Sequence, residues 1–119
     1  MGRASQAHKL DIRGYNSLGE RKALVKILSN VGSDTVDAVV ILNGLWSATD
    51  TIRVITNVGA GNVNSDYSPS GDETAEAAAT GLAAVINGQI DTTASATSNV
   101  IRINKATAGT LTVVDALFV

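Results

Sequence analysis

The residue best suited to proton transfer is the single histidine, His8, which lies in a polar and basic stretch between Gly2 and Gly14. Catalysis by a histidine needs partner groups that a rigid scaffold holds within hydrogen-bonding distance. This stretch offers neither an identifiable partner nor a regular pattern, so we expect His8 to be an exposed polar residue. The chain contains no cysteine, which excludes a thiol nucleophile, a disulfide framework and a cysteine-based zinc site.

Oxygen-bearing side chains between residues 62 and 73 follow the spacing of a calcium-binding loop. The ligand positions of that template are occupied by Asn62, Asn64, Asp66, Ser68, Ser70 and Glu73. However, the first position holds Asn rather than Asp, Tyr67 replaces the required glycine, and Pro69 stiffens the segment. The same spacing arises in any Asn- and Ser-rich loop before a helix, and we therefore expect no metal site.

Two further patterns resemble functional motifs only in part. The Gly-Ala-Gly segment 59–61 follows a strand pattern, as a phosphate-binding loop does, but it lacks the third glycine, the lysine and the helix of such a loop. Asp72, Glu73 and Glu76 are carboxylates close in sequence, yet acids at this place stabilise a helix N-terminus through its dipole. We therefore predict no catalytic, cofactor-binding or metal site, and no enzymatic activity.

The clearest secondary-structure signal is an alanine-rich helix over residues 72–87. Ser70 and Glu73 have the spacing of a capping box, and the Asn-Gly pair at 87–88 supplies an end signal. The apolar positions recur at helical spacing and form one stripe, made of Ala75, Ala78, Ala79, Leu82, Val85 and Ile86. Small side chains on this stripe, with Gly81 beside it, predict a helix that lies close against a sheet.

Strand patterns occupy most of the rest of the chain. β-Branched and alternating apolar residues predict strands over residues 36–43, 51–58, 92–97, 99–105 and 110–119. We expect the first two to form a hairpin or meander with Trp46 between them, and the next two to form a hairpin. Residues 59–71 have no periodic apolar face and are expected to be a loop.

The last predicted strand, 110–119, is apolar on both faces. Its alternation places Leu111, Val113 and Leu117 on one face and Val114, Ala116 and Phe118 on the other. Burying both faces requires a second sheet or a neighbouring subunit, and we favour the neighbour.

The N-terminal part of the chain differs from the rest in charge. Residues 1–26 carry six basic and two acidic side chains, a net charge of +4, whereas residues 27–119 carry three basic and nine acidic ones, a net charge of −6. We expect residues 1–16 to form a basic N-terminal arm and residues 17–119 a single β-rich domain. A basic arm on an acidic body is suited to docking on a copy of itself, and an ordinary solvated tail is the alternative. The overall charge of −2 does not favour nucleic-acid binding.

One segment near the start of the domain, residues 18–31, has an ambiguous pattern. Leu24, Ile27, Leu28 and Val31 recur at helical spacing, which favours a short helix. The alternative is a strand that extends the sheet.

Together these patterns predict an α+β, mostly β fold. We expect a small β-sandwich or barrel-like sheet, with one Ala-rich helix (72–87) packed on it and an extended N-terminal arm. The 119 residues fit one domain. No apolar run reaches the roughly 18 residues of a membrane span, and no hydrophobic stretch follows the first basic residues, so we expect neither a membrane contact nor a secretory signal.

The order of motifs between residues 41 and 109 is distinctive. A strand pair (ILNGLWSATDTIRVITNVG) precedes a polar loop, an Ala-rich helix (SGDETAEAAATGLAAVINGQ) and a hairpin (TTASATSNVIRINKATAGT). This order, over a little more than half of the chain, resembles a module of structural proteins from tailed bacteriophages, including tail tube, tail sheath and capsid-associated subunits. The positions that carry the resemblance are Gly71, Asp72, Thr74, Ala75, Leu82, Ala83, Ile86, Asn87, Ala94, Ser95, Ala96 and Gly109.

The resemblance implies a virion structural protein that is made in the host bacterial cytoplasm and located in the assembled particle. The chain is short for a tail tube subunit and has no long loop for a channel-lining hairpin. We therefore expect a capsid decoration (cement) protein, with a tail tube or another tail or neck subunit in stacked rings as the alternative. Its partners would be copies of itself and the major capsid protein or tail proteins, without sequence-specific nucleic-acid binding.

A carbohydrate- or receptor-binding module is an alternative of another class, and it requires an exposed Trp46 or Tyr67. For a virion subunit, contacts would be made by surfaces rather than by a catalytic site. The expected contact residues are Arg3, Lys9, Arg13, Arg21, Lys22, Trp46, Leu117, Phe118 and Val119. We also expect an exposed contact face around Arg53 and Arg102.

Overall fold

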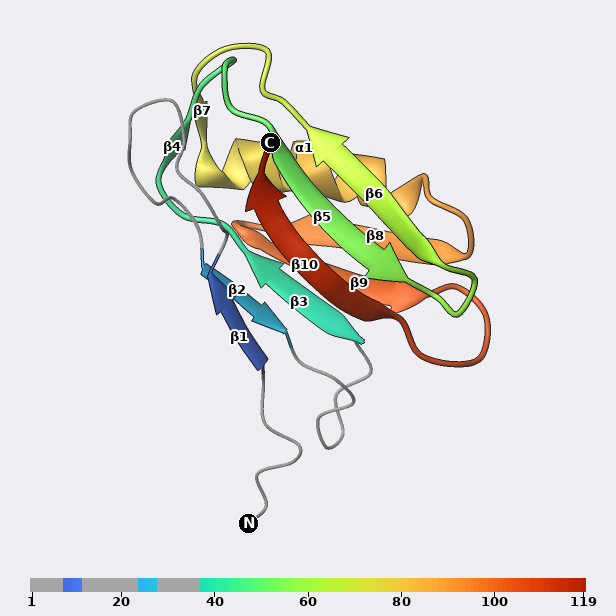
Figure 1. Ribbon diagram of the computed structural model, residues 1–119. Coiled ribbons are helices and arrows are strands. Elements are labelled where there is room, and N and C mark those ends of the chain that lie inside the picture. The colour runs from blue at the N-terminus through green and yellow to red at the C-terminus, as the bar shows by residue number, and fades with distance from the viewer. Residues whose placement is uncertain (1–7, 12–23, 28–36) are drawn as a thin grey trace.

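A computed structural model describes residues 8–11, 24–27 and 37–119 of the chain. Two antiparallel sheets, a short two-stranded pair and the helix α1 (Ala75–Asn87) build this part of the protein (Figure 1). The α+β, mostly β class with one helix is therefore confirmed for the described residues. The strand orders leave each of the two larger sheets with two edges, so the described strands do not close into a single barrel.

The larger sheet has five strands in the order β1-β2-β3-β9-β8. Their bounds are β1 His8–Asp11, β2 Leu24–Ile27, β3 Ala38–Ile41, β9 Val100–Lys105 and β8 Thr92–Thr97. The β8–β9 hairpin confirms the prediction for residues 92–105. The helix favoured within 18–31 is wrong at residues 24–27, because β2 is a strand between β1 and β3. The helical spacing of a few apolar residues is too short a signal to decide between a helix and a strand. Residues 24–27 form a strand because they pair with the neighbouring strands β1 and β3.

Part of the segment expected to be an arm belongs to this sheet. β1 pairs with β2 in the register His8 with Ile27 and Asp11 with Leu24, and it is an edge strand of the sheet. The rest of residues 1–16 lies outside the described residues.

The smaller sheet has three strands in the order β10-β5-β6, with β10 at Thr112–Phe118, β5 at Ile52–Asn57 and β6 at Asn62–Tyr67. Two predictions are corrected by it. β3 and β5 belong to different sheets instead of forming one hairpin. The predicted loop 59–71 contains β6, which pairs with β5 from Ile52–Tyr67 to Asn57–Asn62. β6 is polar because one of its faces is exposed, so it lacks the apolar signal by which strands are identified.

A β-bulge changes the faces of β10 relative to simple alternation. The register with β5 shifts between Val113 and Asp115, so Val113 and Ala116 both pair with residues whose side chains are buried. Val114 is 44% exposed. A bulge adds one residue to one strand of a pair and reverses the order of inward and outward side chains beyond it. Three of the predicted face assignments, for Ala116, Leu117 and Phe118, are therefore wrong, because Ala116 and Phe118 share the inner face with Val113 and Leu117 lies on the outer one.

The helix begins later than the capping box predicted. Its N-cap is Thr74, whose hydroxyl accepts a hydrogen bond from the Ala77 N–H (3.2 Å), and not Ser70. Glu73 and Thr74 instead form β7, which pairs with β4 (Leu45–Trp46). The helix ends at the predicted position, with Gly88 as its C-cap.

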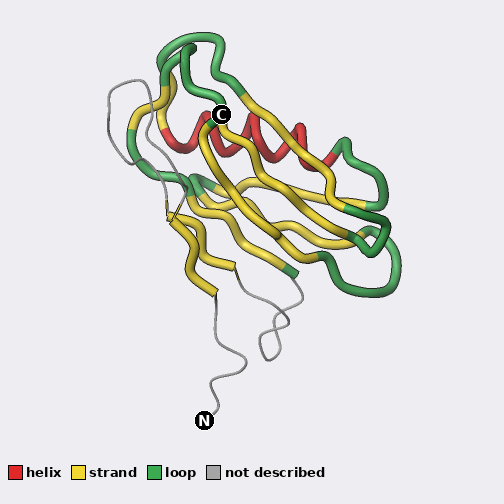
Figure 2. Tube along the Cα trace, viewed as in Figure 1, coloured by secondary structure: helices red, strands yellow, loops and turns green. Residues whose placement is uncertain are grey.

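Figure 2 shows the helix, in red, alongside the yellow strands. Side chains from both larger sheets and the helix share one hydrophobic core. α1 lies against β8 and β9 and beside β6, and it buries Ala75, Ala78, Ala79, Leu82, Ala83 and Ile86. The larger sheet contributes Ala38, Val40, Leu42, Ile101 and Ile103, and the smaller one contributes Ile52, Val54, Val113 and Ala116. A second sheet of the same chain thus covers the inner face of β10, and no neighbour is needed for that face.

The absence of a side chain at Gly81 lets α1 approach β6 closely. A Cβ atom at Gly81 would overlap the ring of Tyr67. The Tyr67 hydroxyl is held in place by a hydrogen bond that it donates to Glu73 (2.7 Å). The predicted close approach of the Ala-faced helix is therefore confirmed.

Candidate functional site

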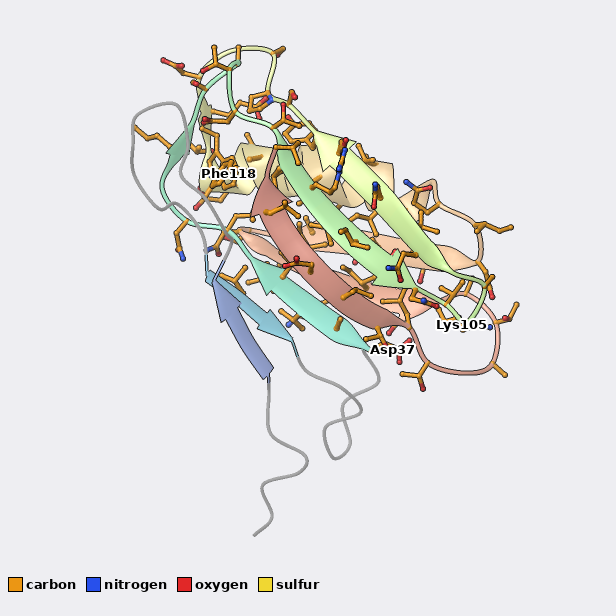
Figure 3. The ribbon with its side chains drawn as sticks, viewed as in Figure 1. Asp37, Lys105 and Phe118 are labelled. Atoms are coloured by element: carbon orange, nitrogen blue, oxygen red, sulfur yellow. The ribbon has the colours of Figure 1, made fainter. Side chains whose placement is uncertain are left out.

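The residues predicted to make contacts fall into two groups. Arg3, Arg13, Arg21 and Lys22 lie outside the described residues, and Lys9 is in the edge strand β1. Trp46 and Phe118 are in contact at one end of the molecule, near the start of α1, and Val119 follows Phe118. Leu117 pairs with Arg53 and lies on the outer face of β10, opposite to Phe118. Figure 3 shows Phe118 at this end, opposite Asp37 and Lys105. We call the part formed by Leu45, Trp46, Asp72, Phe118 and Val119 the Trp46 surface.

The buried ring of Trp46 and the partly buried ring of Phe118 form the floor of the Trp46 surface. Their centroids are 5.3 Å apart with an interplanar angle of 34°. Only 1% of Trp46 is exposed, and its indole Nε1–H donates a hydrogen bond to the Asn43 carbonyl oxygen (3.1 Å). The polar atom of the ring is thus satisfied inside the protein, and Trp46 supports the surface from below instead of projecting from it.

Apolar side chains are exposed around this floor. Leu45 precedes Trp46 in β4, so the two side chains lie on opposite faces of the strand, and Leu45 is 61% exposed. Val119, which follows Phe118, is 55% exposed, and its N–H donates to the Thr51 carbonyl (3.0 Å). Single exposed apolar residues are normal, but each of these two is the sequence neighbour of one ring of the Trp46–Phe118 pair.

A small pocket opens beside Leu45. It has a volume of about 130 Å³ and is lined by Leu45, Trp46, Ser47 and Asp72. Its walls are mostly apolar, and Asp72 supplies a carboxylate at the rim. Glu76, in the first turn of α1, is a second exposed acid, four residues after Asp72 in the sequence. The pocket therefore suits an apolar side chain, or the aliphatic stem of a basic one, from another protein segment.

The face predicted around Arg53 and Arg102 is not one surface. Ile52 and Val54 point into the core from β5, and Ile101 and Ile103 do so from β9, so the two arginines lie on the outer faces of different sheets. Arg53 is further engaged by Asp66 through two hydrogen bonds, of 2.8 and 2.9 Å. These hydrogen bonds hold the pKa of the Asp66 carboxyl below its usual value. Arg102 is exposed on the outer face of β9.

The oxygen ligands of the calcium template do not surround a common point. Asn62, Asn64 and Asp66 alternate along the strand β6 with exposed side chains, and Glu73 accepts the Tyr67 hydroxyl. Within residues 8–11, 24–27 and 37–119, no group of three or more His, Cys, Asp or Glu side chains is placed to hold a metal ion.

Among the described residues near the Trp46 surface, Glu73 and Tyr67 are joined by a hydrogen bond. Glu73 faces Tyr67, whose pKa is raised to about 12, first by burial and then by the hydrogen bond and negative charge of Glu73. A tyrosine with such a pKa stays neutral and donates a hydrogen bond to the carboxylate. This hydrogen bond joins β6 to the junction between β7 and α1, and the proton stays on Tyr67.

Sequence reasoning missed Leu45 and Asp72 as parts of this surface. Leu45 lies in a two-residue strand, and only the pairing of β4 with β7 shows that its side chain points outward next to Asp72. An Asn-Gly turn followed by two large apolar residues was the available signal, since two adjacent residues of a strand cannot both face the core.

No family model, curated protein or solved structure matches this chain. In the part of the chain that the structure describes, no helix is long and apolar enough to cross a membrane.

Proposed function

We propose that the protein is a structural subunit of a tailed-phage virion. Within that class it acts as a capsid decoration (cement) protein, binding the capsid lattice through its basic N-terminal segment and the Trp46 surface. The observation that carries the proposal is the exposure of Leu45 and Val119, which adjoin the buried Trp46 and the partly buried Phe118 of one aromatic pair. Rigid aromatic support beneath exposed aliphatic groups is typical of the central part of a protein interface.

The distribution of charge supports a contact between copies or with a lattice. The Trp46 surface carries Asp72, whereas residues 1–26 have a net charge of +4. Opposite charges on two parts of one chain attract neighbouring copies and fix their relative orientation. A contact between two different surfaces of identical subunits gives rings or lattices by repetition.

The oligomeric state of the purified protein and its binding to empty capsids test the proposal. Light scattering during size-exclusion chromatography, followed by negative-stain imaging, is expected to show a monomer or small trimer, and this species should bind empty capsids when mixed with them. Spontaneous rings or tubes would instead place the protein in the tail, as a tube or neck subunit. A monomer that binds neither capsids nor tails would contradict the proposal.

A pair of substitutions tests the surface itself. Leu45→Ser should weaken particle binding by about tenfold or more, because it removes an exposed apolar contact at the pocket. Ile90→Ser is the matched control, since Ile90 is 72% exposed but follows the opposite end of α1. Neither substitution removes a buried group, so both variants should unfold at the urea concentration of the unchanged protein. Equal binding by the two variants would exclude the Trp46 surface.

The contribution of the N-terminal segment is best tested by charge reversal. Deletion of residues 1–16 removes β1 from the sheet and would change stability together with binding. Arg3→Glu and Arg13→Glu leave β1 in place. The doubly substituted protein should lose binding to particles at low salt while its melting temperature stays the same. Unchanged binding would show that the basic segment does not make the contact.

A further inference from the structure

The sequence contains two Asn-Gly pairs, Asn43-Gly44 and Asn87-Gly88. At such a pair, the amide nitrogen of the glycine is able to attack the side-chain amide carbon of the asparagine, because glycine has no Cβ to obstruct the approach. The reaction requires a free side-chain amide, a free glycine N–H and a backbone that can bring the two together. The structure distinguishes the two pairs on all three counts.

Asn43-Gly44 is in the connection between β3 and β4 and is exposed. Within the described part of the chain, neither the Asn43 side-chain amide nor the Gly44 N–H makes a hydrogen bond. Gly44 has φ 82°, a left-handed conformation that favours glycine and belongs to an irregular turn. Both reacting groups are thus accessible, and no regular ladder fixes the backbone between them.

Asn87-Gly88 is at the end of α1 and is held by hydrogen bonds. The Asn87 side-chain oxygen accepts from the Ala94 N–H at 3.0 Å. The Gly88 N–H points back into the helix, toward the carbonyl oxygens of Ala84 (3.3 Å) and Val85 (3.2 Å). The Gly88 N–H and the Asn87 side-chain amide are therefore each hydrogen-bonded to other groups.

We propose that Asn43 is a site of spontaneous deamidation in the folded protein and that Asn87 is protected. A base removes the Gly44 amide proton, and the nitrogen attacks Cγ of Asn43. The bond from Cγ to the side-chain nitrogen breaks, and ammonia leaves with one added proton. Water then opens the cyclic imide at one of two carbons. Opening at Cγ gives an ordinary aspartyl residue in place of the asparagine, and opening at the main-chain carbonyl carbon gives an isoaspartyl linkage.

The modification would change the Trp46 surface. Either product adds a negative charge two residues before Leu45, at the residue whose carbonyl oxygen binds the Trp46 indole. In the isoaspartyl product the chain continues through the former side-chain carbon. The carbonyl oxygen of Asn43 that accepts the indole hydrogen bond then becomes part of a carboxylate. Deamidation at Asn43 would therefore alter the Trp46 surface with time. This inference does not depend on the proposed virion role.

Peptide mass spectrometry after incubation in mildly alkaline buffer tests the inference. In the native protein, the peptide that contains Asn43 should gain the mass expected for replacing an amide by an acid. The rate of this deamidation should be within a few fold of the rate in urea-unfolded protein. Asn87 should react at least about tenfold more slowly in the native protein than in the unfolded one, since a local opening of the helix end must precede attack. In urea the two sites should react at similar rates.

Asn43→Gln is the matched variant, because it keeps an amide but forms the larger cyclic imide slowly. Its Trp46 fluorescence, from the single tryptophan of the chain, should stay constant during incubation while that of the unchanged protein shifts. Equal native rates at Asn43 and Asn87, or a native rate at Asn43 far below the rate in urea, would overturn the inference.

Discussion

The buried carboxylate of Asp37 accepts a hydrogen bond from the backbone N–H of Leu111, 74 residues further along the chain, at 3.1 Å. The same oxygen, Oδ2, also accepts from the Lys105 N–H at 2.9 Å. Asp37 stands at the start of β3, Lys105 ends β9 and Leu111 precedes β10. The Asp37 side chain therefore links the larger sheet to the segment that leads into β10 of the smaller sheet.

We expect Asp37→Ala to lower the free energy of unfolding by about 3 kcal/mol, because two N–H groups lose a charged acceptor in a place that water does not reach. Urea denaturation followed by Trp46 fluorescence measures the change. Asp66→Ala is the comparison, since the exposed ion pair with Arg53 is screened by water and should contribute much less to stability. If both variants lost the same small amount, the assigned role of Asp37 would be wrong.

Gly81→Ala should destabilise the protein, although alanine is normally favoured over glycine in a helix by about 1 kcal/mol. The new Cβ would overlap the Tyr67 ring, whose hydroxyl is fixed by Glu73. In a Tyr67→Ala background the same substitution should stabilise the helix. A double-mutant cycle of unfolding free energies measures this reversal of sign. The same effect in both backgrounds would contradict the close contact.

The raised pKa of Tyr67 predicts a dependence of stability on high pH. The folded state holds the phenol proton up to a pKa of about 12, against a usual value of 10.0, because burial and Glu73 disfavour the phenolate. This contribution is fully present below pH 10.0 and is lost as the pH rises toward about 12.

Urea unfolding across this range, with Tyr67→Phe as the comparison, measures the Tyr67 contribution. In the Tyr67→Phe variant, the free energy of unfolding should not show the decrease that ionisation of Tyr67 causes. Glu73→Gln should lower the pKa of Tyr67 only in part, because burial is the larger cause. A pH profile of the Phe variant that matched the unchanged protein would show that Tyr67 is not responsible.

The burial of Trp46 predicts weak quenching of its fluorescence by acrylamide in the folded protein. With 1% of the residue exposed, quenching should rise several fold when the protein unfolds. The carbohydrate-binding alternative needs an exposed ring at Trp46 or Tyr67, and Tyr67 is half-buried with its hydroxyl engaged. Strong quenching in the folded state would restore that alternative.

The sequence by itself determined the elements whose signals are local. The β8–β9 hairpin and the end of α1 lie where alternation and the Asn-Gly pair at 87–88 predict them. The alanine stripe of α1 also predicted its buried face almost completely, because a helix that packs on a sheet must turn its apolar side inward. The mostly β class followed from the same local patterns.

Tertiary structure alone decided the features that depend on distant partners. β6 is a polar strand because β5 pairs with it, and β2 is a strand because it lies between β1 and β3. Thr74 became the N-cap because residues 73–74 pair with β4, which moved the helix start beyond the predicted capping box. The bulge in β10 and the outward position of Leu45 likewise depend on pairing, and hydrogen bonds to a strand far along the chain leave no mark in the local pattern.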